Sequence, residues 1–383
     1  MAERHKKSIL VITGARADYG LLRPIMREIA QSDALELRVL VTGMHTLTRY
    51  GHTEDLVRAD GMPVVVVVPV SEDDEMTDAL AAEIRGIGEY CRAHRPDLIL
   101  VLGDRDESFA GAIVGGHLGI PVAHVHGGDK TGPAVDEYIR HATTKFSHIH
   151  FPATKKSAQR IKLLGEEPWR IVMVGGPGLD ELRTVPECSR ESLAQRYGLL
   201  SDKPWHVVLH NPTPLDPVPY RDQISPLLRV MGGLDSEKIV IYPNSDTGSD
   251  VFIAELEAQK DTRGVHLFRN LPREDLINTL RQAEFLAGNS SMGIIDCSFL
   301  KLPVVNVGNR QAMRERGSNV VDCGYAEEEI RAAISKVTAI SFRHRMHFSK
   351  SPYGDGHAAE RIVRELERLM ARSDLLDKQL TYK

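Results

Sequence analysis

Some of the acidic side chains of this chain are crowded at the end of an apolar run. Residues 103–108 (GDRDES) bring three acids and an arginine together directly after the run Leu98–Leu102. Such crowding is costly unless the side chains face a cleft, so we expect Asp104 to point toward a ligand and Arg105 to carry positive charge beside it. The alternative is a helix start with a surface ion pair.

A second polar stretch, residues 124–129 (HVHGGD), places two imidazoles and a carboxylate around a Gly-Gly turn. His124 and His126 alternate along a predicted strand and would share a face. One of the two is expected to be a satisfied structural residue. His126, Asp129 and the nearby Asp136 are candidates for general acid/base work. A metal site on the two histidines and Asp129 stays open as a rival.

Two small-residue loops lie between a predicted strand and a predicted helix, where backbone N–H groups can bind an anion. In residues 13–20 (TGARADYG), Arg16 adds a guanidinium fork, although a tight turn with a solvated arginine fits as well. In residues 288–293 (GNSSMG), two hydroxyls either seat a phosphate or cap the helix. We predict that this helix runs to residue 299 and that Asp296 along it accepts hydrogen bonds from ribose hydroxyls.

Two further loops follow predicted strands of the second half of the chain. Residues 308–314 (GNRQAMR) carry Arg310 after the strand at 304–307. Together with residues 288–293, this loop favours a diphosphate site. His210 ends another strand, where it is either a group facing a ligand or an ordinary lone histidine.

Alternating strands and helices are predicted to position these loops. Strands are predicted at 9–13, 37–41, 64–68, 98–102, 122–125, 149–151, 171–174, 206–209, 239–242, 265–267, 285–287 and 304–307, with helices at 21–30, 76–93 and 153–164. The run 98–102 is apolar throughout, as in a strand covered on both faces, and we expect 64–68 to be buried too. This alternation predicts an α/β protein made of βαβ units with parallel sheets.

The rhythm breaks near Gly175 and then restarts, which predicts two Rossmann-like domains. We place the N-terminal domain at residues 1–180, with the sugar and the catalytic groups, and the nucleotide-binding domain at 181–356. Residues 357–383 would form a C-terminal helix, about 358–375, packed across the junction. Ligands of open parallel sheets bind at the carboxyl ends of the strands, so we expect the two sheets to face a central cleft.

The overall composition argues against several classes of protein. Among 383 residues, 42% are hydrophobic and 26% charged, and the net charge of -5 predicts no basic face for nucleic acid. No apolar run approaches the roughly 20 residues that span a bilayer, and no signal peptide is visible at the start. The four cysteines are far apart, which predicts neither disulfides nor structural zinc, and we expect a cytoplasmic protein.

Taken in order along the chain, the motifs resemble those of the hydrolysing UDP-N-acetylglucosamine 2-epimerases of sialic and nonulosonic acid pathways. The resemblance extends from Gly14 to Arg361 and is carried by GARADYG, LGDRDE, HVHGGD, DEYIRHATTKFSHIHF, GNSSMGIID, NVGNRQ and SPYGDGHAAERI. It implies the GT-B fold, with the nucleotide held mainly by the second domain. It also implies a nucleotide sugar as the partner, no metal or other cofactor, and a homodimer or homotetramer.

The resemblance also implies roles for individual residues. Catalysis would fall on Asp104, His126 or Asp129, Asp136 and His210, and substrate binding on Arg16, Arg105, Ser290, Ser291, Gly293, Asp296 and Arg310. The chain departs from the family in having His126 where some members have glutamate, and Asp129 and Asp296 where glutamate is common. These departures fit a subfamily that acts on a different sugar, such as a diacetamido-trideoxyhexose.

The implied reaction converts UDP-N-acetylglucosamine and water to N-acetylmannosamine and UDP through a 2-acetamidoglycal. Departure of UDP builds positive charge on the sugar and negative charge on the diphosphate, which carboxylates and arginines respectively stabilise. One alternative is a hydrolysing 2-epimerase of UDP- or GDP-2,4-diacetamido-2,4,6-trideoxyhexose. Others are a GT-B glycosyltransferase, a metal-dependent hydrolase and a non-catalytic nucleotide-sugar sensor. A non-hydrolysing epimerase usually carries an HVEAG segment, which this sequence lacks.

Overall fold

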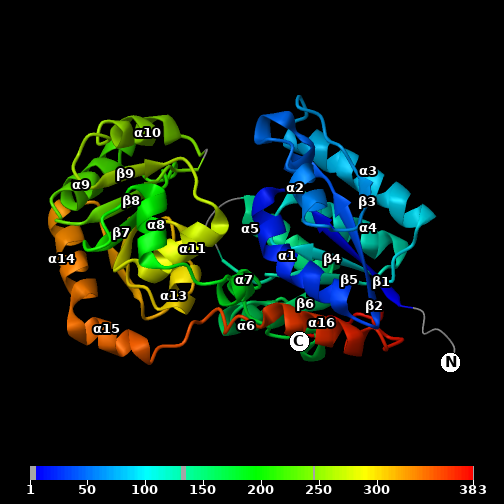
Figure 1. Cartoon of the computed structure of the whole chain (residues 1–383). Helices are drawn as coiled ribbons and strands as arrows, with labels where there is room; N and C mark the ends of the chain where they lie inside the picture. The colour runs from blue at the N-terminus through cyan, green and yellow to red at the C-terminus, as the bar shows by residue number, and fades with distance from the viewer. Residues whose placement is uncertain (1–5, 131–134, 245, 383) are drawn as a thin grey trace. The chain divides into compact units, whose positions relative to one another are not determined.

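The computed structural model describes residues 6–130, 135–244 and 246–382 (Figure 1). The chain forms two compact units, one made of Met1–Glu181 and Gly354–Lys383 and the other of Leu182–Tyr353. We call them unit 1 and unit 2. Each contains a six-stranded sheet in which every strand pair is parallel. The predicted α/β class with parallel sheets is confirmed.

Unit 1 has the strand order β3-β2-β1-β4-β5-β6. Its strands are β1 (Lys7–Thr13), β2 (Leu35–Val41), β3 (Val64–Val67), β4 (Leu98–Leu102), β5 (Val122–Val125) and β6 (Ile149–Phe151). Its helices are α1 (Arg16–Gln31), α2 (Glu54–Ala59), α3 (Met76–Ala93), α4 (Asp106–Leu118), α5 (Val135–Phe146), α6 (Lys155–Leu163) and α16 (Ala358–Leu369), and α7 (Gly178–Thr184) lies at the boundary with unit 2. Every residue of β4 is buried, as its apolar sequence predicts.

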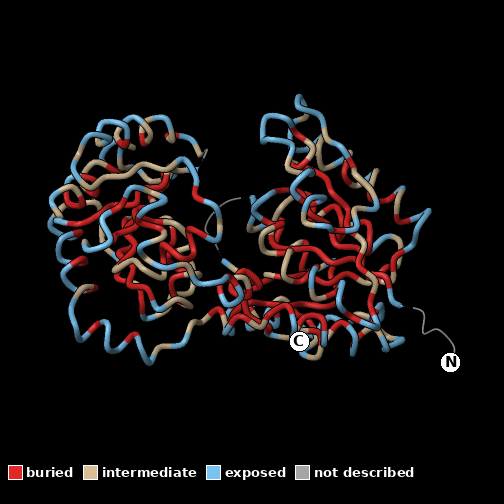
Figure 2. Tube along the Cα trace, viewed as in Figure 1, coloured by how far each residue is buried: buried red, intermediate tan, exposed pale blue. Residues whose placement is uncertain are grey.

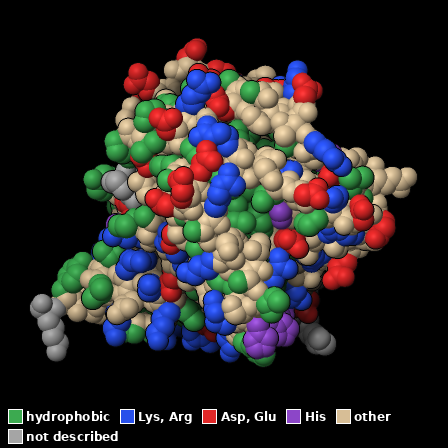
Figure 3. All heavy atoms as spheres, turned by 90° about the vertical axis from the view of Figure 1, so that its left-hand side faces the viewer, with side chains coloured by type: hydrophobic (Ala, Val, Ile, Leu, Met, Phe, Trp, Pro, Cys, Tyr) green, Lys and Arg blue, Asp and Glu red, His purple; other side chains and the backbone are tan. Residues whose placement is uncertain are grey.

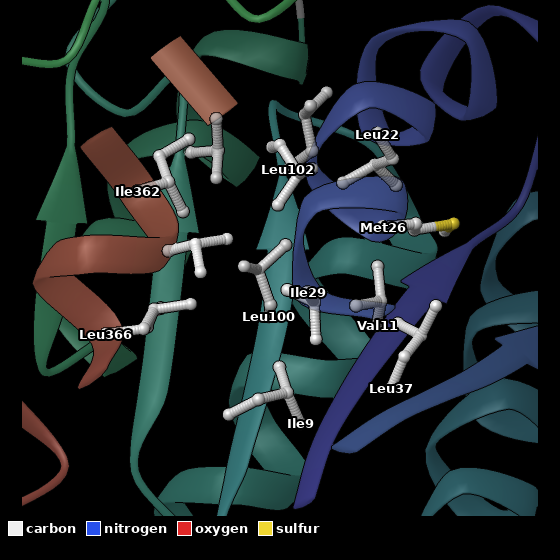
Figure 4. Packing of buried hydrophobic residues seen from close by; sticks show 14 of the residues in the cluster. Ile9, Val11, Leu22, Met26, Ile29, Leu37, Leu100, Leu102, Ile362 and Leu366 are labelled. Atoms are coloured by element: carbon white, nitrogen blue, oxygen red, sulfur yellow. The ribbon is translucent and has the colours of Figure 1, made fainter. Parts of the chain in front are cut away.

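The C-terminal helix belongs to the core of unit 1. Ile362, Leu366 and Leu369 of α16 are fully buried, and Figure 4 shows Ile362 and Leu366 in one packed cluster with Leu100 of β4 and Ile29 of α1. The carboxylate of Asp180 accepts hydrogen bonds from the N–H groups at the start of this helix. We expected the helix to pack across the junction and to reach residue 375, whereas its apolar stripe and this cap hold it in unit 1 and it ends at Leu369.

Unit 2 has the strand order β12-β11-β10-β7-β8-β9. Its strands are β7 (Trp205–Leu209), β8 (Glu237–Ile241), β9 (Val265–Phe268), β10 (Phe285–Gly288), β11 (Val304–Val307) and β12 (Val320–Cys323). Its helices are α8 (Arg190–Tyr197), α9 (Tyr220–Gly232), α10 (Ser249–Glu257), α11 (Arg273–Gln282), α12 (Ser291–Ile294), α13 (Asp296–Leu300), α14 (Glu327–Thr338) and α15 (Ile340–His347). Figure 2 shows that buried residues concentrate in the strands of both units.

Three of the predicted elements differ from the structure in burial, length or continuity, and one strand was not predicted. The strand at 64–68 is half exposed because β3 lies at the edge of its sheet, where Val65 is 42% exposed. The predicted strand at 171–174 is reduced to one bridge between Ile171 and His150. The single helix predicted to residue 299 is broken at Ile295 into α12 and α13. The strand β12 was not predicted, since its sequence mixes valines with polar residues.

The surface carries mixed charge. On the face drawn in Figure 3, acidic and basic side chains are interspersed, with Lys and Arg gathered toward its lower part. The exposed side chains of α15 include two arginines and two histidines (Arg343, Arg345, His344 and His347). Across the described residues, no helix combines the length and the apolar character that a membrane span requires.

Candidate active site

In each unit the strand order reverses once, and the loops beside the reversal carry the predicted site residues. In unit 1, β2 and β3 lie on one side of β1, and β4 lies on the other. In unit 2, β8 and β9 lie on one side of β7, and β10 lies on the other. Ligands of open α/β sheets bind outside the carboxyl ends of the strands at such a reversal. We therefore take the loops after β1, β4, β7 and β10, with those beside them, as candidate site loops.

The loop after β1 binds a carboxylate of its own chain. The N–H groups of Gly14 and Ala15 donate to the carboxylate of Asp18 at 3.1 and 2.6 Å, and Thr13 Oγ1 donates to it at 2.9 Å. The N–H groups that we expected to bind an anion are thus already used. Arg16 is exposed at the start of α1.

The two charged residues after β4 have different partners. Asp104 forms an ion pair with Arg140 of α5. Arg105 donates through Nε to Glu107 Oε1 at 2.7 Å and through Nη2 to Met44 Sδ at 3.2 Å. Glu107 is buried, which raises the pKa of its carboxyl, and Arg105 opposes that rise. Arg105 is therefore fixed in place by a buried acid and remains 39% exposed.

The buried guanidinium of Arg140 joins three parts of unit 1. Besides Asp104, it contacts Glu137 Oε1 at 2.8 Å and the main-chain oxygen of Asp129 at 3.0 Å. Asp136 is exposed in the first turn of the same helix. Our sequence reasoning gave Arg140 no role. The spacing of Glu137 and Arg140 suggests an ion pair within the helix, but the partners in distant loops leave no trace in the sequence.

The two histidines of the third loop have different environments. His124 is fully buried, with Nε2 2.7 Å from the oxygen of Gly103 and Nδ1 3.2 Å from Thr144 Oγ1. Burial lowers the pKa of His124 to about 3, so it is a neutral structural residue. β5 ends at Val125, and His126 adopts a left-handed backbone with φ of 60°. The strand alternation that we assumed for the two histidines therefore stops one residue short of His126.

These contacts argue against a metal site on the two histidines and Asp129. Both nitrogens of His124 are directed at Gly103 and Thr144. Among the described residues, no group of three or more His, Cys, Asp or Glu side chains could hold a metal ion.

Asp129 itself is held by two side chains. Its Oδ2 lies 2.9 Å from His126 Nδ1, and its Oδ1 accepts a hydrogen bond from Ser157 Oγ at 2.7 Å. Ser157 belongs to the first turn of α6, and nothing in the sequence pointed to it. The structure thus brings His126 and Asp129 together and adds a serine.

Other titratable groups are buried near the loops after β1 and β4. His45 Nε2 lies 3.1 Å from Thr13 Oγ1, and burial lowers the pKa of His45 to about 4. Glu83 of α3 is 2% exposed. Burial, with help from the nearby charges of Glu107 and Asp106, raises the pKa of Glu83 to about 8. Unit 1 therefore holds several carboxyl groups with raised pKa values close to the loops that carry Arg16 and Arg105.

In unit 2, one asparagine holds the loops after β7, β10 and β11 together. Asn289 accepts from Asn211 N–H at 2.7 Å and donates to the Asn211 oxygen at 2.8 Å. Gln311 donates to the main-chain oxygen of Asn289 at 3.0 Å. Gly288, with φ of 141°, allows the end of β10 to lie close to the end of β7, because a Cβ there would lie 2.1 Å from the oxygen of Leu209.

His210 directly follows β7 and precedes Asn211 in the chain. Its side chain is almost completely buried, and neither ring nitrogen has a hydrogen-bond partner within the described part of the chain. A buried polar group without a partner is costly, so such a group commonly marks a place where a bound molecule supplies the missing contact.

The remaining predicted residues of unit 2 surround the same strand ends. Ser290 caps α12 by accepting from Met292 N–H at 3.3 Å, and Ser291 and the buried Gly293 follow it. Arg310 lies 3.5 Å from the Asn289 oxygen and 3.4 Å from Asp246. Asp296 begins α13 and is ion-paired with Arg273 at 3.0 Å, while burial raises the pKa of its carboxyl. We expected Asp296 along a continuous helix, and the break at Ile295 puts it at a helix start instead.

Comparison with known proteins gives consistent results across the chain. A sequence profile of the family described as UDP-N-acetylglucosamine 2-epimerase matches residues 27–367. The chain is 35% identical to the UDP-N,N'-diacetylbacillosamine 2-epimerase (hydrolyzing) of Legionella pneumophila, over 98% of this chain and 100% of that protein. It is 32% identical to the UDP-N-acetylglucosamine 2-epimerase of Neisseria meningitidis, over 87% and 88% respectively.

The fold agrees with these sequence matches. The crystal structure of a Listeria monocytogenes protein, described as a putative UDP-N-acetylglucosamine 2-epimerase, superposes with a TM-score of 0.80 at 19% identity, covering 97% of this chain and 98% of that one. This confirms the expected GT-B-like class of two Rossmann-like domains. The protein is thus an enzyme of the UDP-N-acetylglucosamine 2-epimerase family, as its motifs, its fold and its relatives agree.

Proposed function

We propose that the protein is a hydrolysing 2-epimerase of UDP-2,4-diacetamido-2,4,6-trideoxyhexose, which releases UDP and the free 2-epimeric sugar. The observation that carries this substrate is the full-length similarity to the Legionella pneumophila enzyme, which spans all of that protein. The departures from common family residues at His126 and Asp129, noted above, support a sugar other than N-acetylglucosamine.

The acidic and imidazole groups of unit 1 act on the sugar in this proposal. Loss of UDP builds positive charge at the anomeric carbon, and the carboxylates of Asp104 and Asp136 stabilise that charge. Asp104 is held by Arg140, whereas Asp136 is exposed at the start of α5. His126 and Asp129 supply proton transfer at carbon 2. The product glycal then adds water, which gives the free sugar with inverted configuration at carbon 2.

The basic groups and the strand-end loops stabilise the leaving diphosphate. In unit 2, Arg310 and the N-terminal serines of α12 contact the phosphates, and His210 completes its hydrogen bonding with them. Asp296 accepts from the ribose, and Gly293 leaves room for close approach. Arg16 and Arg105 are the positive charges that the unit 1 loops offer to a phosphate. The enzyme must lower the activation free energy by at least ~8 kcal/mol. In this proposal the charged side chains do so by stabilising the positive sugar and the negative diphosphate in the transition state.

The test is a proton NMR time course in deuterated water with purified protein and each candidate substrate at the same concentration. UDP-2,4-diacetamido-2,4,6-trideoxyglucose should give free sugar deuterated at carbon 2 and free UDP, with the highest kcat/KM. A sugar returned still attached to UDP would identify a non-hydrolysing epimerase. No turnover of any substrate, in a protein that binds UDP by calorimetry, would overturn the proposed reaction.

UDP-N-acetylglucosamine is the second candidate substrate. It is favoured by the similarity to the Neisseria meningitidis enzyme, at slightly lower identity and over less of the chain. The same time course separates the two, because a higher kcat/KM with UDP-N-acetylglucosamine reverses our order. The GDP-linked diacetamido sugar belongs in the same comparison, since only the base differs.

A further inference from the structure

We infer that His126 is the base that removes the proton from carbon 2, and that Asp129 and Ser157 are positioning residues that hold its imidazole in the active form. This inference rests on the proposed 2-epimerase function. It assigns different roles to two residues that the sequence could not distinguish, and it adds a third from another element.

The first observation is that Asp129 uses both carboxylate oxygens inside the protein. Oδ1 accepts from Ser157 Oγ at 2.7 Å, and Oδ2 lies 2.9 Å from His126 Nδ1. A carboxylate held in this way has little freedom to reach a substrate atom, whereas it is well suited to orient the imidazole beside it.

The direction of the hydrogen bonds follows from the donors available. An ionised carboxylate only accepts, so Ser157 Oγ and His126 Nδ1 must both donate to Asp129. Thr154 Oγ1, 2.9 Å from Ser157 Oγ, then donates to that hydroxyl and accepts from Ser157 N–H at 3.1 Å. Because His126 carries its proton on Nδ1, the lone pair of a neutral ring is on Nε2.

The remaining nitrogen is available for chemistry. His126 Nε2 has no hydrogen-bond partner in the described residues. It is also not fully buried, since the fully buried nitrogen and oxygen atoms without a partner do not include it. The imidazole therefore has one nitrogen fixed by a carboxylate and one open, which is the arrangement of a general base oriented by an acid.

The backbone of the loop is built to hold this arrangement. His126 has φ of 60°, a left-handed conformation that is uncommon for a residue other than glycine. Gly128 fits against α6 only because it lacks a side chain, since a Cβ would lie 2.3 Å from the main-chain oxygen of Ser157. Arg160 of the same helix donates to the Gly128 oxygen at 2.7 Å. The helix α6 is thus the platform on which the loop rests.

Titratable and charged groups surround the loop that carries this imidazole. The charged ones are Asp129 in the loop, Asp104 after β4, Arg140 on α5 and Arg160 on α6, and His124 on β5 is neutral. Asp104 and Arg140 are paired with each other, which leaves Asp129 as the charge in direct contact with the ring.

The proposed step balances as an elimination. The Nε2 lone pair of His126 takes the proton of carbon 2 as the C–H bond breaks. The electrons of that bond form the double bond between carbons 1 and 2, and the electrons of the C1–O bond leave with UDP. The imidazolium that forms is stabilised by Asp129 through Nδ1–H.

The test combines three variants with a matched control on the best substrate of the time course. His126→Asn removes the imidazole with a residue that tolerates a left-handed backbone, and should lower kcat about 10²- to 10⁴-fold. Asp129→Asn should lower kcat by a similar factor, because the amide can favour the other tautomer. Ser157→Ala should lower kcat about five-fold with KM unchanged. The control Ser147→Ala removes a buried hydroxyl that, among the described residues, donates to the Thr143 oxygen alone, and it should leave kcat unchanged.

The pH dependence of kcat/KM distinguishes the two possible bases. If His126 is the base, wild type loses activity on the acid side as the imidazole is protonated, and Asp129→Asn moves that loss to lower pH while retaining it. His126→Asn abolishes it. If instead Asp129→Asn abolishes the acid-side loss and His126→Asn retains it, Asp129 is the base and the inference is wrong.

A measurement without turnover separates this inference from the proposed function. Nitrogen-15 NMR of the imidazoles, with His126 assigned by its absence in His126→Asn, should show a protonated Nδ1 and an unprotonated Nε2 in wild type but not in Asp129→Asn. The opposite tautomer in wild type would overturn the inference whatever the substrate is. Loss of all turnover with the expected tautomer would instead count against the proposed function.

Discussion

The imidazole of His210 is stacked on the ring of Phe252, with the ring centroids 5.5 Å apart and the planes inclined by 11°. The ring of Tyr325 lies edge-on to the same imidazole, with its centroid 6.4 Å away. Burial lowers the pKa of His210 to about 3, so the ring is neutral at physiological pH. In the proposed function, His210 would therefore offer the phosphate one neutral N–H donor rather than a positive charge.

We predict that His210→Phe separates stability from activity. Phenylalanine fills the same space beside Phe252 and removes two buried nitrogens that lack partners, so the free energy of unfolding should stay the same or rise by about 1 kcal/mol. The kcat/KM should fall at least about ten-fold, with weaker UDP binding. Urea unfolding, calorimetry with UDP and steady-state kinetics check this. Unchanged kcat/KM would show that His210 is a structural residue.

Gly14→Ala should disturb the loop after β1 through its neighbour. The added Cβ would lie 2.3 Å from the carboxyl of Glu107, which is buried and held by Arg105. We expect a loss of about 1–3 kcal/mol in the free energy of unfolding and a reduced kcat, since Arg105 must move. Gly20→Ala is the matched control. A Cβ there meets nothing within 4 Å, and alanine should stabilise α1 by about 0.5–1 kcal/mol. Equal effects of the two changes would contradict the steric argument.

The sequence predicted the strand ends but not what the loops do there. The apolar runs and the spacing of turns predicted most strands, and they put Asp104, His210 and Arg310 after strands that the structure confirms. The use of the Gly14 and Ala15 N–H groups by Asp18 was not visible, because a βα loop that binds an anion and one that binds its own carboxylate have the same residue types.

Contacts between distant segments were equally hidden. Ser157 reaches Asp129 from 28 residues away, and Arg140 reaches Asp104 across 36 residues. Local periodicity carries no information on such pairs. The position of α16 in unit 1 depends likewise on Asp180, which precedes it by 178 residues.

Arg140→Met should strongly destabilise unit 1. Arg140 is 1% exposed and interacts with Asp104, Glu137 and the Asp129 oxygen, so its removal leaves two carboxylates without their shared cation. Breaking a buried ion pair from one side costs about 3–5 kcal/mol. Arg58→Met removes an exposed pair with Glu54 and should cost less than about 0.5 kcal/mol. Urea unfolding of both variants tests this, and a similar small loss in both would show that the Arg140 contacts are energetically unimportant.

Lys378→Met should loosen the end of α5. Lys378 Nζ donates to the oxygens of Thr144, Lys145 and Ser147 and pairs with Glu166 at 2.7 Å, so one side chain satisfies several carbonyls at the helix end. We expect a loss of about 2–3 kcal/mol and faster amide hydrogen exchange in α5. Lys162→Met, an exposed change on α6, should stay within about 0.5 kcal/mol of wild type. Unchanged exchange in α5 would refute the role of Lys378 as its cap.

Glu83→Gln should change stability in a pH-dependent way. Burial raises the pKa of Glu83 in the folded protein to about 8, from the ordinary value of 4.5 that applies when the chain is unfolded. Between these pH values the folded state retains a proton that the unfolded state has lost, so wild-type stability falls as pH rises and levels off above about 8. Glutamine has the shape of the protonated acid and does not titrate.

The free energy of unfolding of Glu83→Gln should therefore exceed that of wild type by an amount that grows between pH 5 and pH 8, on the order of a few kcal/mol at about 1.4 kcal/mol per pH unit. Other groups titrate in both proteins and cancel in the difference. Glu89→Gln on the exposed side of α3 is the control, and its difference from wild type should not vary with pH. Urea unfolding at four pH values measures both. A constant difference for Glu83→Gln would mean that this carboxyl is ionised in the folded protein, and that its unpartnered Oε2 is compensated in some other way.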